Sequence, residues 1–206
     1  MICAIVLAAG KSRRMGTQKL LLPIGEQPII ARIVDTVLSS SGVDSTLVVN
    51  GGDGPAVRAA LAGRPVHFID NPAEDGDMLS SVRCGVRFLP GICRGFLVVL
   101  GDQPGVTPEL VSTLVAAHWQ HAPTSILVPN VAGRRGHPIF IPATYTDEVL
   151  TRFDGIGLRG LLDTHPESVT DIPFPVSMAD AMRDIDTPDD YRRMQAAADA
   201  DQWRNW

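Results

Sequence analysis

The sequence predicts an α/β protein with a mainly parallel sheet and helices on both of its faces. Short apolar runs of strand length alternate with segments of helical periodicity through most of the chain. Several of these runs are apolar at consecutive positions, which is typical of parallel strands buried on both faces. The 206 residues, 45% of them apolar, are enough for one substantial core and too few for several. We therefore expect residues 1–206 to form a single domain.

Seven apolar runs bounded by turn residues are expected to be strands. They are Cys3–Ala9, Thr46–Asn50, Val66–Ile69, Phe96–Leu100, Ser125–Pro129, Pro138–Ile141 and Val169–Phe174. The expected helices are Pro28–Ser40, Pro55–Leu61, Leu79–Phe88, Pro108–His121, Ala143–Arg152, Leu158–Thr164 and Pro188–Gln202. Thr107 and Thr187 mark two helix starts, because each places a capping hydroxyl before a proline at the first helical position. Residues 132–174 are expected to be an excursion within the same domain.

The charge and composition of the chain argue against several classes of protein. A net charge of −5 disfavours a broad basic surface, so we expect no nucleic-acid partner. No apolar run reaches the length of a membrane span and the first residues lack a basic leader, so we expect a cytoplasmic protein with no membrane partner. Cys3, Cys84 and Cys93 are odd in number and widely spaced, which favours reduced, mostly buried thiols over disulfides or a zinc site.

A basic loop that contains glycine follows the first predicted strand and reads GKSRRMG from Gly10 to Gly16. Ligands of open α/β sheets bind at the carboxyl ends of the strands. Glycines let such a loop turn tightly, and its backbone N–H groups can converge on phosphate oxygens. The spacing matches neither a dinucleotide fingerprint nor a Walker loop. The residues indicate a phosphate-binding loop, and a solvated basic turn is the alternative.

Lysine is scarce in this chain, since only Lys11 and Lys19 among the 18 basic residues are lysines. Because the chain otherwise supplies positive charge as arginine, the lysine at position 19 indicates a specific role. A compact ammonium group suits point contact with a phosphate whose charge moves between its oxygens. We interpret Lys11, which has no such separate indication, as a solvated neighbour.

Asp102 and Asp186 are candidate metal ligands. Asp102 directly follows the predicted strand Phe96–Leu100, where a side chain would face the ligand crevice. Asp186 lies immediately before the cap of the last long helix. Asp184, on the other side of the turn, is the alternative metal ligand at this position. Two carboxylates brought together can hold Mg²⁺, which also takes waters and phosphate oxygens. The alternatives are a turn residue at Asp102 and a helix-entry charge at Asp186.

Two further segments combine glycine with polar side chains. Residues 75–83, DGDMLSSVR, lead from a loop into a helix rich in small residues, where backbone and hydroxyl groups can contact the edge of a base. The alternative is ordinary helix capping by Ser80 or Ser81. Residues 134–138, RRGHP, form a basic turn that could receive an anionic group, and the alternative for His137 is a structural histidine.

The string LAAGKSRRMGTQKLLLPIGEQPII closely resembles the opening motif of the nucleotidyltransferases that attach nucleotides to molybdopterin, in particular the molybdenum cofactor cytidylyltransferase branch. The resemblance continues in GDMLSSVRCGV, LGDQPGVTPELV, GRRGHPIFIP and DIDTPDDY, in the expected order and over nearly the whole chain. A motif with this many fixed positions is a specific signal. The resemblance implies a Rossmann-like, three-layer α/β/α nucleotidyltransferase fold.

The resemblance also implies an activity: transfer of CMP from CTP to the terminal phosphate of molybdopterin, with release of pyrophosphate. It implies Mg²⁺ as the cofactor, held by Asp102 and Asp186, and a catalytic set of Arg14, Lys19 and Asp102. The residues implied to bind the nucleotide are Leu7, Ala8, Ala9, Gly10, Ser12, Arg13, Arg14, Lys19, Gly76, Asp77, Ser80 and Ser81, and those implied to bind the acceptor are Gly136, His137 and Pro138. Ala9 favours CTP, because guanylyl-transferring relatives more often have L-A-G-G in the first motif.

Two alternatives stay open. One is a transferase of the same fold that uses GTP or another acceptor, such as a sugar phosphate. The other is a non-catalytic carrier that binds the cofactor and hands it to a molybdenum hydroxylase, which is also the expected recipient of the transferase product. The carrier is less favoured, because it has no need for a complete triphosphate and metal site.

Overall fold

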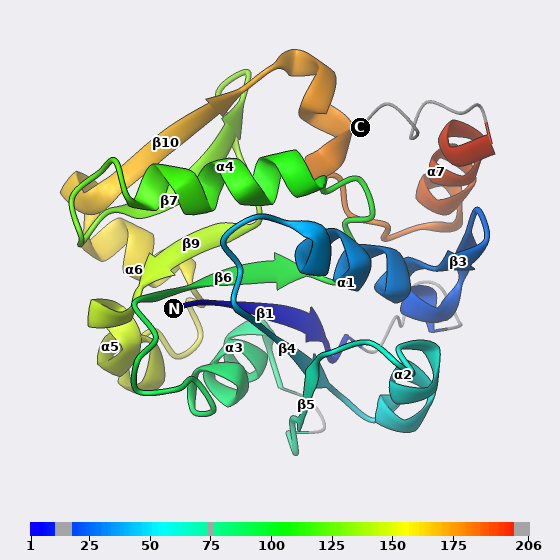
Figure 1. Cartoon of the computed structure of the whole chain (residues 1–206), viewed down its shortest axis with the longest axis horizontal. Coiled ribbons are helices and arrows are strands. Elements are labelled where there is room, and N and C mark those ends of the chain that lie inside the picture. Colours follow the sequence, from blue (N-terminus) through cyan, green and yellow to red (C-terminus); the bar gives the residue numbers. More distant parts are fainter. Residues whose placement is uncertain (11–17, 74–75, 200–206) are drawn as a thin grey trace.

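The computed structural model describes residues 1–10, 18–73 and 76–199 of the chain. Its main feature is an eight-stranded sheet with the order β10-β7-β9-β6-β1-β4-β5, in which β8 pairs with β7 at the side (Figure 1). The strands are β1 Ile2–Ala8, β4 Ser45–Asn50, β5 His67–Asp70, β6 Gly95–Leu100, β7 Ile126–Val131, β8 Arg134–Arg135, β9 Ile139–Pro142 and β10 Val169–Phe174. The pairs β1–β4, β1–β6, β4–β5 and β7–β10 are parallel, and the pairs made by β8 and β9 are antiparallel.

Helices cover both faces of this sheet. They are α1 Ile29–Ser39, α2 Gly54–Ala60, α3 Met78–Val86, α4 Pro108–His118, α5 Thr146–Thr151, α6 Arg159–Thr164 and α7 Pro188–Asp199. Short 3₁₀ turns are η1 Lys19–Leu21, η2 Ala143–Tyr145, η3 Pro166–Ser168 and η4 Val176–Met182, and a small separate hairpin joins β2 Pro23–Ile24 to β3 Gln27–Pro28. The α/β fold class predicted from the sequence is confirmed.

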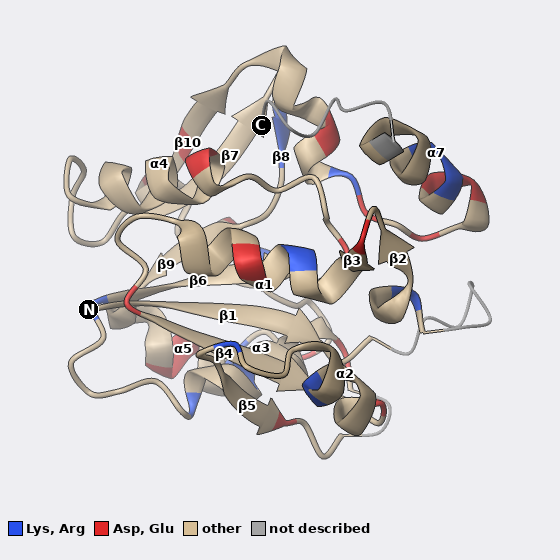
Figure 2. Cartoon of the chain, turned by 45° about the vertical axis from the view of Figure 1, so that its right-hand side comes forward, with Lys and Arg blue, Asp and Glu red and all other residues tan. Residues whose placement is uncertain are grey.

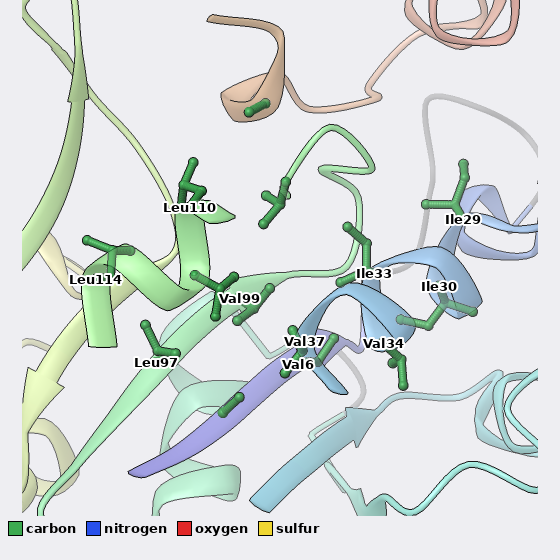
Figure 3. Packing of buried hydrophobic residues seen from close by; sticks show 14 of the residues in the cluster. Val6, Ile29, Ile30, Ile33, Val34, Val37, Leu97, Val99, Leu110 and Leu114 are labelled. Carbon is green, nitrogen blue, oxygen red and sulfur yellow. The ribbon is translucent and has the colours of Figure 1, made fainter. Parts of the chain in front are cut away.

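The two faces of the sheet are buried in two separate apolar clusters. Val6 of β1 belongs to the cluster that joins the sheet to α1 and α4 (Figure 3), whereas its neighbour Ile5 belongs to the cluster under α3, α5 and α6. Alternate residues of a strand point to opposite faces, so a strand between two helical layers needs apolar residues at every position. Each such fully buried aliphatic side chain contributes about 1.5–3 kcal/mol to stability. This burial explains the consecutive apolar runs in the sequence.

Most predicted elements end within two residues of the observed ones. The predicted helix Pro108–His121 runs three residues past α4, Ala143–Arg152 begins as the 3₁₀ turn η2, and the predicted helix end at Gln202 lies outside the described residues. Val169–Phe174 agrees with β10 at both ends, and Thr46–Asn50 differs from β4 by one residue. The periodicity missed the hairpin of β2 and β3 and the strand β8, since two residues are too few to show a period. The expected excursion over residues 132–174 includes β9, which inserts antiparallel between β6 and β7.

Both predicted helix caps are present. The Thr107 side chain accepts a hydrogen bond from the Leu110 backbone N–H at 3.2 Å. Thr187 accepts one from the Asp190 N–H at 3.2 Å, and the Asp190 carboxylate accepts in return from the Thr187 N–H at 2.8 Å. The pKa of the Asp190 carboxyl is lowered to about 2, chiefly by the hydrogen bond that it accepts from the Thr187 hydroxyl. This reciprocal capping fixes the start of α7 and the loop that leads into it.

Cys3 and Cys84 are buried free thiols and Cys93 is half-buried, as expected for reduced cysteines. Among the described residues, no helix is long and apolar enough to span a membrane.

Candidate active site

A cavity of about 250 Å³ opens at the carboxyl ends of β1 and β6, which point the same way in Figure 1. We call it the strand-end cavity. Its lining residues are Leu7, Ala9, Gly10, Lys19, Leu20, Gly76, Asp77, Met78, Ser81, Leu100, Gly101, Asp102 and Asp184. They come from the ends of two adjacent strands and the residues after them, from the 3₁₀ turn η1, from the start of α3 and from the turn that leads to α7. A ligand site is expected at this edge of an open α/β sheet.

Two glycines bring the chain close enough to build the cavity. A Cβ atom on Gly101 would lie 2.6 Å from the Leu7 carbonyl oxygen, and one on Gly51 would lie 2.8 Å from the Ala9 carbonyl oxygen. Both contacts would be with backbone atoms, which cannot move aside cheaply. The Gly101 N–H donates to the Leu7 carbonyl at 3.0 Å, so the chain after β6 stays beside β1 for one more residue. As a result Asp102 emerges at the wall of the cavity.

Lys19, Asp102 and Asp186 form a charged cluster beside the cavity, here called the aspartate–lysine cluster. The Lys19 Nζ lies 2.6 Å from Asp102 Oδ2 and 3.1 Å from Asp186 Oδ1. It also donates a hydrogen bond to the Ile185 carbonyl oxygen at 2.7 Å. The Lys19 side chain is 11% exposed and that of Asp102 is 23% exposed, so these charges interact in a medium less polar than water. Residues that are 167 positions apart along the chain thus meet at one nitrogen atom.

The turn before α7 is tied to the end of β6 by two contacts. The Ile185 N–H donates to the Asp102 carbonyl oxygen at 3.0 Å. The buried Gln103 side chain donates from Nε2 to Asp184 Oδ1 at 2.7 Å and to the Met182 carbonyl oxygen at 3.3 Å. Together these contacts place Asp186 opposite Asp102. Gln103 follows Asp102 in the sequence, and its role was not predicted because nothing in the sequence indicates which loop a glutamine will contact.

The electrostatics of the cluster favour a charged lysine. Burial alone would lower the pKa of Lys19, but the attraction of Asp102 and Asp186 outweighs burial, so the pKa of Lys19 is raised. Burial raises the pKa of Asp184, and the hydrogen bond from Gln103 opposes this change. The site therefore holds a fixed cation between two carboxylates, with a third, partly buried carboxyl group nearby.

The donors of this site match the preferences of Mg²⁺ or a similar hard cation. Such ions take oxygen ligands, commonly one or two protein carboxylates together with waters and substrate phosphate oxygens. Asp102 and Asp186 are two carboxylates that already contact a single cation, the ammonium group of Lys19. Within the described part of the chain there is no group of three or more metal-ligating side chains. Waters and substrate oxygens are the other ligands that such an ion commonly takes.

The opposite wall of the cavity is the start of α3. Asp77 caps this helix, because its side chain accepts from the Ser80 backbone N–H at 2.8 Å. The capping alternative that named Ser80 or Ser81 is therefore wrong, since the cap is Asp77. Asn71 donates from Nδ2 to both serine hydroxyls at 3.0 Å, which holds them in place. Ser81 lines the cavity and Ser80 does not.

The structure brings most of the predicted nucleotide-binding residues to one cavity. Those that line it are Leu7, Ala9, Gly10, Lys19, Gly76, Asp77 and Ser81, together with the predicted metal ligand Asp102. Ala8 is buried in the apolar cluster on the α1 side of the sheet. Ser12, Arg13 and Arg14 lie outside the described residues. The sequence reasoning missed Leu20, Met78, Leu100 and Gly101, although the last two stand directly before Asp102.

The predicted acceptor segment Gly136-His137-Pro138 lies against the turn before α7. A Cβ atom on Gly136 would lie 2.5 Å from the Met182 sulfur, so this glycine permits the close approach. The His137 Nε2 atom is buried and has no hydrogen-bond partner among the described residues. Burial lowers the pKa of His137 to about 4, against the opposing influence of Asp102. The segment therefore lies within electrostatic reach of the aspartate–lysine cluster, and its imidazole is neutral near pH 7.

Basic and acidic residues are interspersed along the described elements, as the mixed colours of α7 in Figure 2 illustrate. Positive charge at the cavity is local.

An open, mostly parallel α/β sheet with a cavity at its strand ends, beside which a lysine lies between two aspartates, has the features that a nucleotide-dependent transferase needs. The chain belongs to the MobA-like NTP transferase domain family, whose model matches residues 4–169. It is an enzyme of the nucleotidyltransferase type.

Two curated proteins illustrate the relationship. The chain is 31% identical over 198 residues to a molybdenum cofactor guanylyltransferase of Mesorhizobium japonicum, and the match covers 92% of each chain. It is 37% identical over 117 residues to the bifunctional protein GlmU of Halorhodospira halophila, a match that covers 56% of this chain and 24% of that protein. The chain thus spans about a quarter of the length of this second relative.

Solved structures of similar chains agree with the fold. A nucleotidyl transferase from Methanothermobacter has a TM-score of 0.83 and 28% identity, with 97% of this chain and 98% of that chain covered. A protein of Mycobacterium tuberculosis, solved as a complex with manganese, has a TM-score of 0.74 and 26% identity, with 95% of this chain and 98% of that chain covered.

Proposed function

We propose that the protein transfers the CMP group of CTP to the terminal phosphate of a molybdopterin-type acceptor and releases pyrophosphate. The aspartate–lysine cluster at the mouth of the strand-end cavity is the observation on which this proposal depends. A cation between two carboxylates, beside a cavity at the ends of parallel strands, suits a substrate that carries several phosphates and a divalent metal ion. The full-length match to a molybdenum cofactor guanylyltransferase supports the acceptor class.

Asp102 and Asp186 are proposed to hold Mg²⁺. The ion would supply charge neutralisation on the phosphate oxygens. The manganese complex of the similar mycobacterial protein supports a divalent ion without selecting magnesium. Lys19 is proposed to contact the α-phosphate, and Arg14 is proposed to add positive charge from the loop after β1.

The remaining chemistry needs only positioning. The acceptor phosphate is already ionised near neutral pH, so it can attack the α-phosphorus without a general base. The bond between the acceptor oxygen and the α-phosphorus forms as the bond to the β-phosphate oxygen breaks, and pyrophosphate leaves with the electron pair. Alignment of the two phosphates and neutralisation of their charge account for the rate in this type of reaction.

Ala9 supports CTP as the donor. It lines the cavity with Gly10, and its backbone packs against Gly51, so the wall that faces a base is short and fixed. Gly76, Asp77 and Ser81 complete the other side and are proposed to contact the base or ribose, with Ser80 holding the same turn. GTP is the second candidate donor, because one relative that is matched over 92% of its length is named a guanylyltransferase.

Gly136, His137 and Pro138 are proposed to bind the acceptor. Two observations support this placement: the segment packs on the turn before α7, and the buried Nε2 of His137 lacks a partner among the described residues. A neutral imidazole there can donate one hydrogen bond to an anionic acceptor. A molybdenum hydroxylase is proposed as the recipient of the product.

The test is incubation of the purified protein with each of the four nucleoside triphosphates, Mg²⁺ and a panel of acceptors that includes molybdopterin and a sugar phosphate. Pyrophosphate release and the mass of the product are measured. CTP with molybdopterin is expected to give pyrophosphate and a product heavier by one cytidylyl group. A guanylyl product would select the second donor. Tight molybdopterin binding with no pyrophosphate from any triphosphate would support the carrier and contradict the transferase.

A further inference from the structure

Lys19 occupies the position from which a divalent cation would contact Asp102 and Asp186. Its Nζ lies 2.6 Å from Asp102 Oδ2 and 3.1 Å from Asp186 Oδ1. A Mg²⁺ ion bound to the same two oxygens would lie about 2.1 Å from each of them. The ammonium group and the ion would then compete for the same two oxygens. Two positive charges so close repel each other strongly in a partly buried site.

We propose that in the nucleotide-free protein Lys19 is an internal counter-ion that excludes the divalent cation, and that cation binding moves its ammonium group from the carboxylates to the nucleotide phosphates. The second half of this inference rests on the proposed function, because that function supplies the phosphates. The first half concerns only the chain itself. It predicts that the metal ion binds weakly before the nucleotide and firmly together with it.

The burial of the cluster gives the physical reason for this coupling. The Lys19 side chain is 11% exposed, so its ammonium group depends on protein oxygens for much of its stabilisation. If a metal ion takes both carboxylates, the Ile185 carbonyl oxygen still lies within reach, but a neutral carbonyl compensates a charge less well than two carboxylates do. A triphosphate in the cavity restores anionic partners to the lysine. Nucleotide binding therefore lowers the free-energy cost of metal binding, and the reverse also holds.

The geometry of the turn before α7 supports the same conclusion. The backbone contact from Ile185 to Asp102 and the side-chain contacts of Gln103 hold this turn against the end of β6. The two carboxylates are thus held close to each other by contacts that do not involve Lys19. Removal of the ammonium group is expected to take one positive charge from between the two carboxylates, which makes them a more attractive site for a divalent cation.

The experiment measures Mn²⁺ binding to the nucleotide-free protein by the loss of the free Mn²⁺ paramagnetic resonance signal. Lys19→Met removes the ammonium group and keeps a chain of similar length. It is expected to bind Mn²⁺ at least about tenfold more tightly than the wild type, within the usual range of coupling between sites. Lys19→Arg keeps the charge and is expected to bind as weakly as the wild type. The double variant Lys19→Met with Asp102→Asn is expected to lose the gain.

Arg159→Met is the matched control, because it removes one positive charge from an exposed ion pair on α6, far along the sheet from the cavity (Figure 1). It is expected to bind Mn²⁺ like the wild type. Each variant is first checked for a cooperative thermal unfolding transition, and Lys19→Gln replaces Lys19→Met if the latter does not fold.

Equal Mn²⁺ affinity of the wild type and Lys19→Met would overturn the inference. An equal gain in Lys19→Arg or Arg159→Met would also overturn it, because the effect would then not require an ammonium group at this position. The proposed function is tested separately by pyrophosphate release. A wild type that releases pyrophosphate while Lys19→Met shows no gain in affinity would remove the inference and leave the function intact. If Lys19→Met gains Mn²⁺ affinity but the wild type makes no pyrophosphate with any acceptor, the proposed function is contradicted and the inference about Lys19 stands.

Discussion

The ammonium group of Lys19 and the carboxylate of Asp102 form an ion pair of 2.6 Å at the cavity wall. In the proposed reaction both groups act on charge that moves between phosphate oxygens. Lys19→Ala and Asp102→Ala are therefore each expected to lower turnover by about two or more orders of magnitude, as the loss of a preorganised charge does in similar sites. Pyrophosphate release at saturating nucleotide is the measurement.

The control for this pair is Arg159→Ala, which changes the charge on an exposed helix away from the cavity. It is expected to keep wild-type turnover. Near-normal pyrophosphate release by a folded Lys19→Ala or Asp102→Ala protein would contradict the assigned roles.

Two consecutive glycines at the end of β4 provide a matched pair of substitutions. A Cβ atom on Gly51 would lie 2.8 Å from the Ala9 carbonyl oxygen and 3.1 Å from the Ala9 Cα, whereas a Cβ on Gly52 would meet nothing within 4 Å. Gly51→Ala is expected to push Ala9 into the cavity, to lower the free energy of unfolding by about 1–3 kcal/mol and to raise the KM for the nucleotide.

Gly52→Ala is expected to leave the KM unchanged and to stabilise the chain slightly, by up to about 1 kcal/mol, through the unfolded state. Denaturant unfolding and nucleotide-dependent rates are compared for the two variants. If the two variants have the same free energy of unfolding and the same KM, the backbone of Ala9 does not form a fixed wall of the cavity.

Some residues of the site could be identified from the sequence alone and others could not. Lys19 was identified because lysine is scarce, and Asp102 because it directly follows an apolar strand. Gln103 could not be identified, since its role depends on a turn some 80 residues away, as the separation from Asp184 shows. Asp184 and Asp186 could not be distinguished either, because the direction of each side chain is set by contacts that form only in the folded chain. In the structure Asp184 lines the cavity and Asp186 contacts Lys19.

At the level of secondary-structure elements, the position of the turn before α7 depends on Gln103. Its Nε2 donates to Asp184 Oδ1 at 2.7 Å and to the Met182 carbonyl oxygen at 3.3 Å. Gln103→Leu removes both hydrogen bonds and leaves two acceptors buried or partly buried without this donor. A loss of about 1–3 kcal/mol in the free energy of unfolding is expected. Because the Ile185 backbone contact would then hold Asp186 opposite Asp102 without the contacts of Gln103, the metal concentration for half-maximal activity is expected to rise.

Gln120→Leu is the matched control for this substitution, because Gln120 is exposed just after α4. It is expected to change neither stability nor metal dependence. If Gln103→Leu lowers stability while the metal dependence stays at the wild-type value, Gln103 supports the fold and does not position Asp186.

Long elements could be predicted from the sequence, whereas very short ones could not. Strands of six or seven residues, such as β1 and β6, have enough apolar positions to be recognised, and the caps at Thr107 and Thr187 fix two helix starts. The two-residue strands β2, β3 and β8 are defined by their pairing partners, which the local sequence does not reveal. The same limit applies to η4, which carries Met182 against Gly136.

For the molecule as a whole, the sequence predicted two helical layers but not the order of the strands. The antiparallel strand β9 separates β6 from β7, so the part of the sheet with β7 and β10 is joined to the part with β6, β1, β4 and β5 through one antiparallel strand. Strand order depends on contacts between distant segments, which the periodicity of a single chain does not reveal. The turn before α7 links the two parts, because Met182 lies against Gly136 and the Ile185 N–H donates to the Asp102 carbonyl oxygen.

The stability of the whole molecule is expected to depend on pH through its buried histidines. His118 is 7% exposed, its ring packs on Phe140 at 4.5 Å between centroids, and its Nδ1 has no partner among the described residues. Burial lowers the pKa of His118, with a smaller contribution from Arg94. His118 is thus neutral in the folded protein at a pH where it becomes protonated in the unfolded chain. Its contribution to stability is complete above a pH of about 6.5 and is lost as the pH falls below that value.

His118→Phe keeps an aromatic ring against Phe140 and removes the proton-binding nitrogen. The free energy of unfolding of the wild type is expected to fall more steeply between pH 7.5 and pH 5 than that of His118→Phe, by up to about 1.4 kcal/mol per pH unit below 6.5. Denaturant unfolding at several pH values measures this difference.

His67→Phe, which removes an exposed imidazole at the start of β5, is the control and is expected to keep the wild-type dependence of stability on pH. Parallel curves for the wild type and His118→Phe would mean that His118 takes up its proton without unfolding, and that the layer between α4 and β9 is open to water.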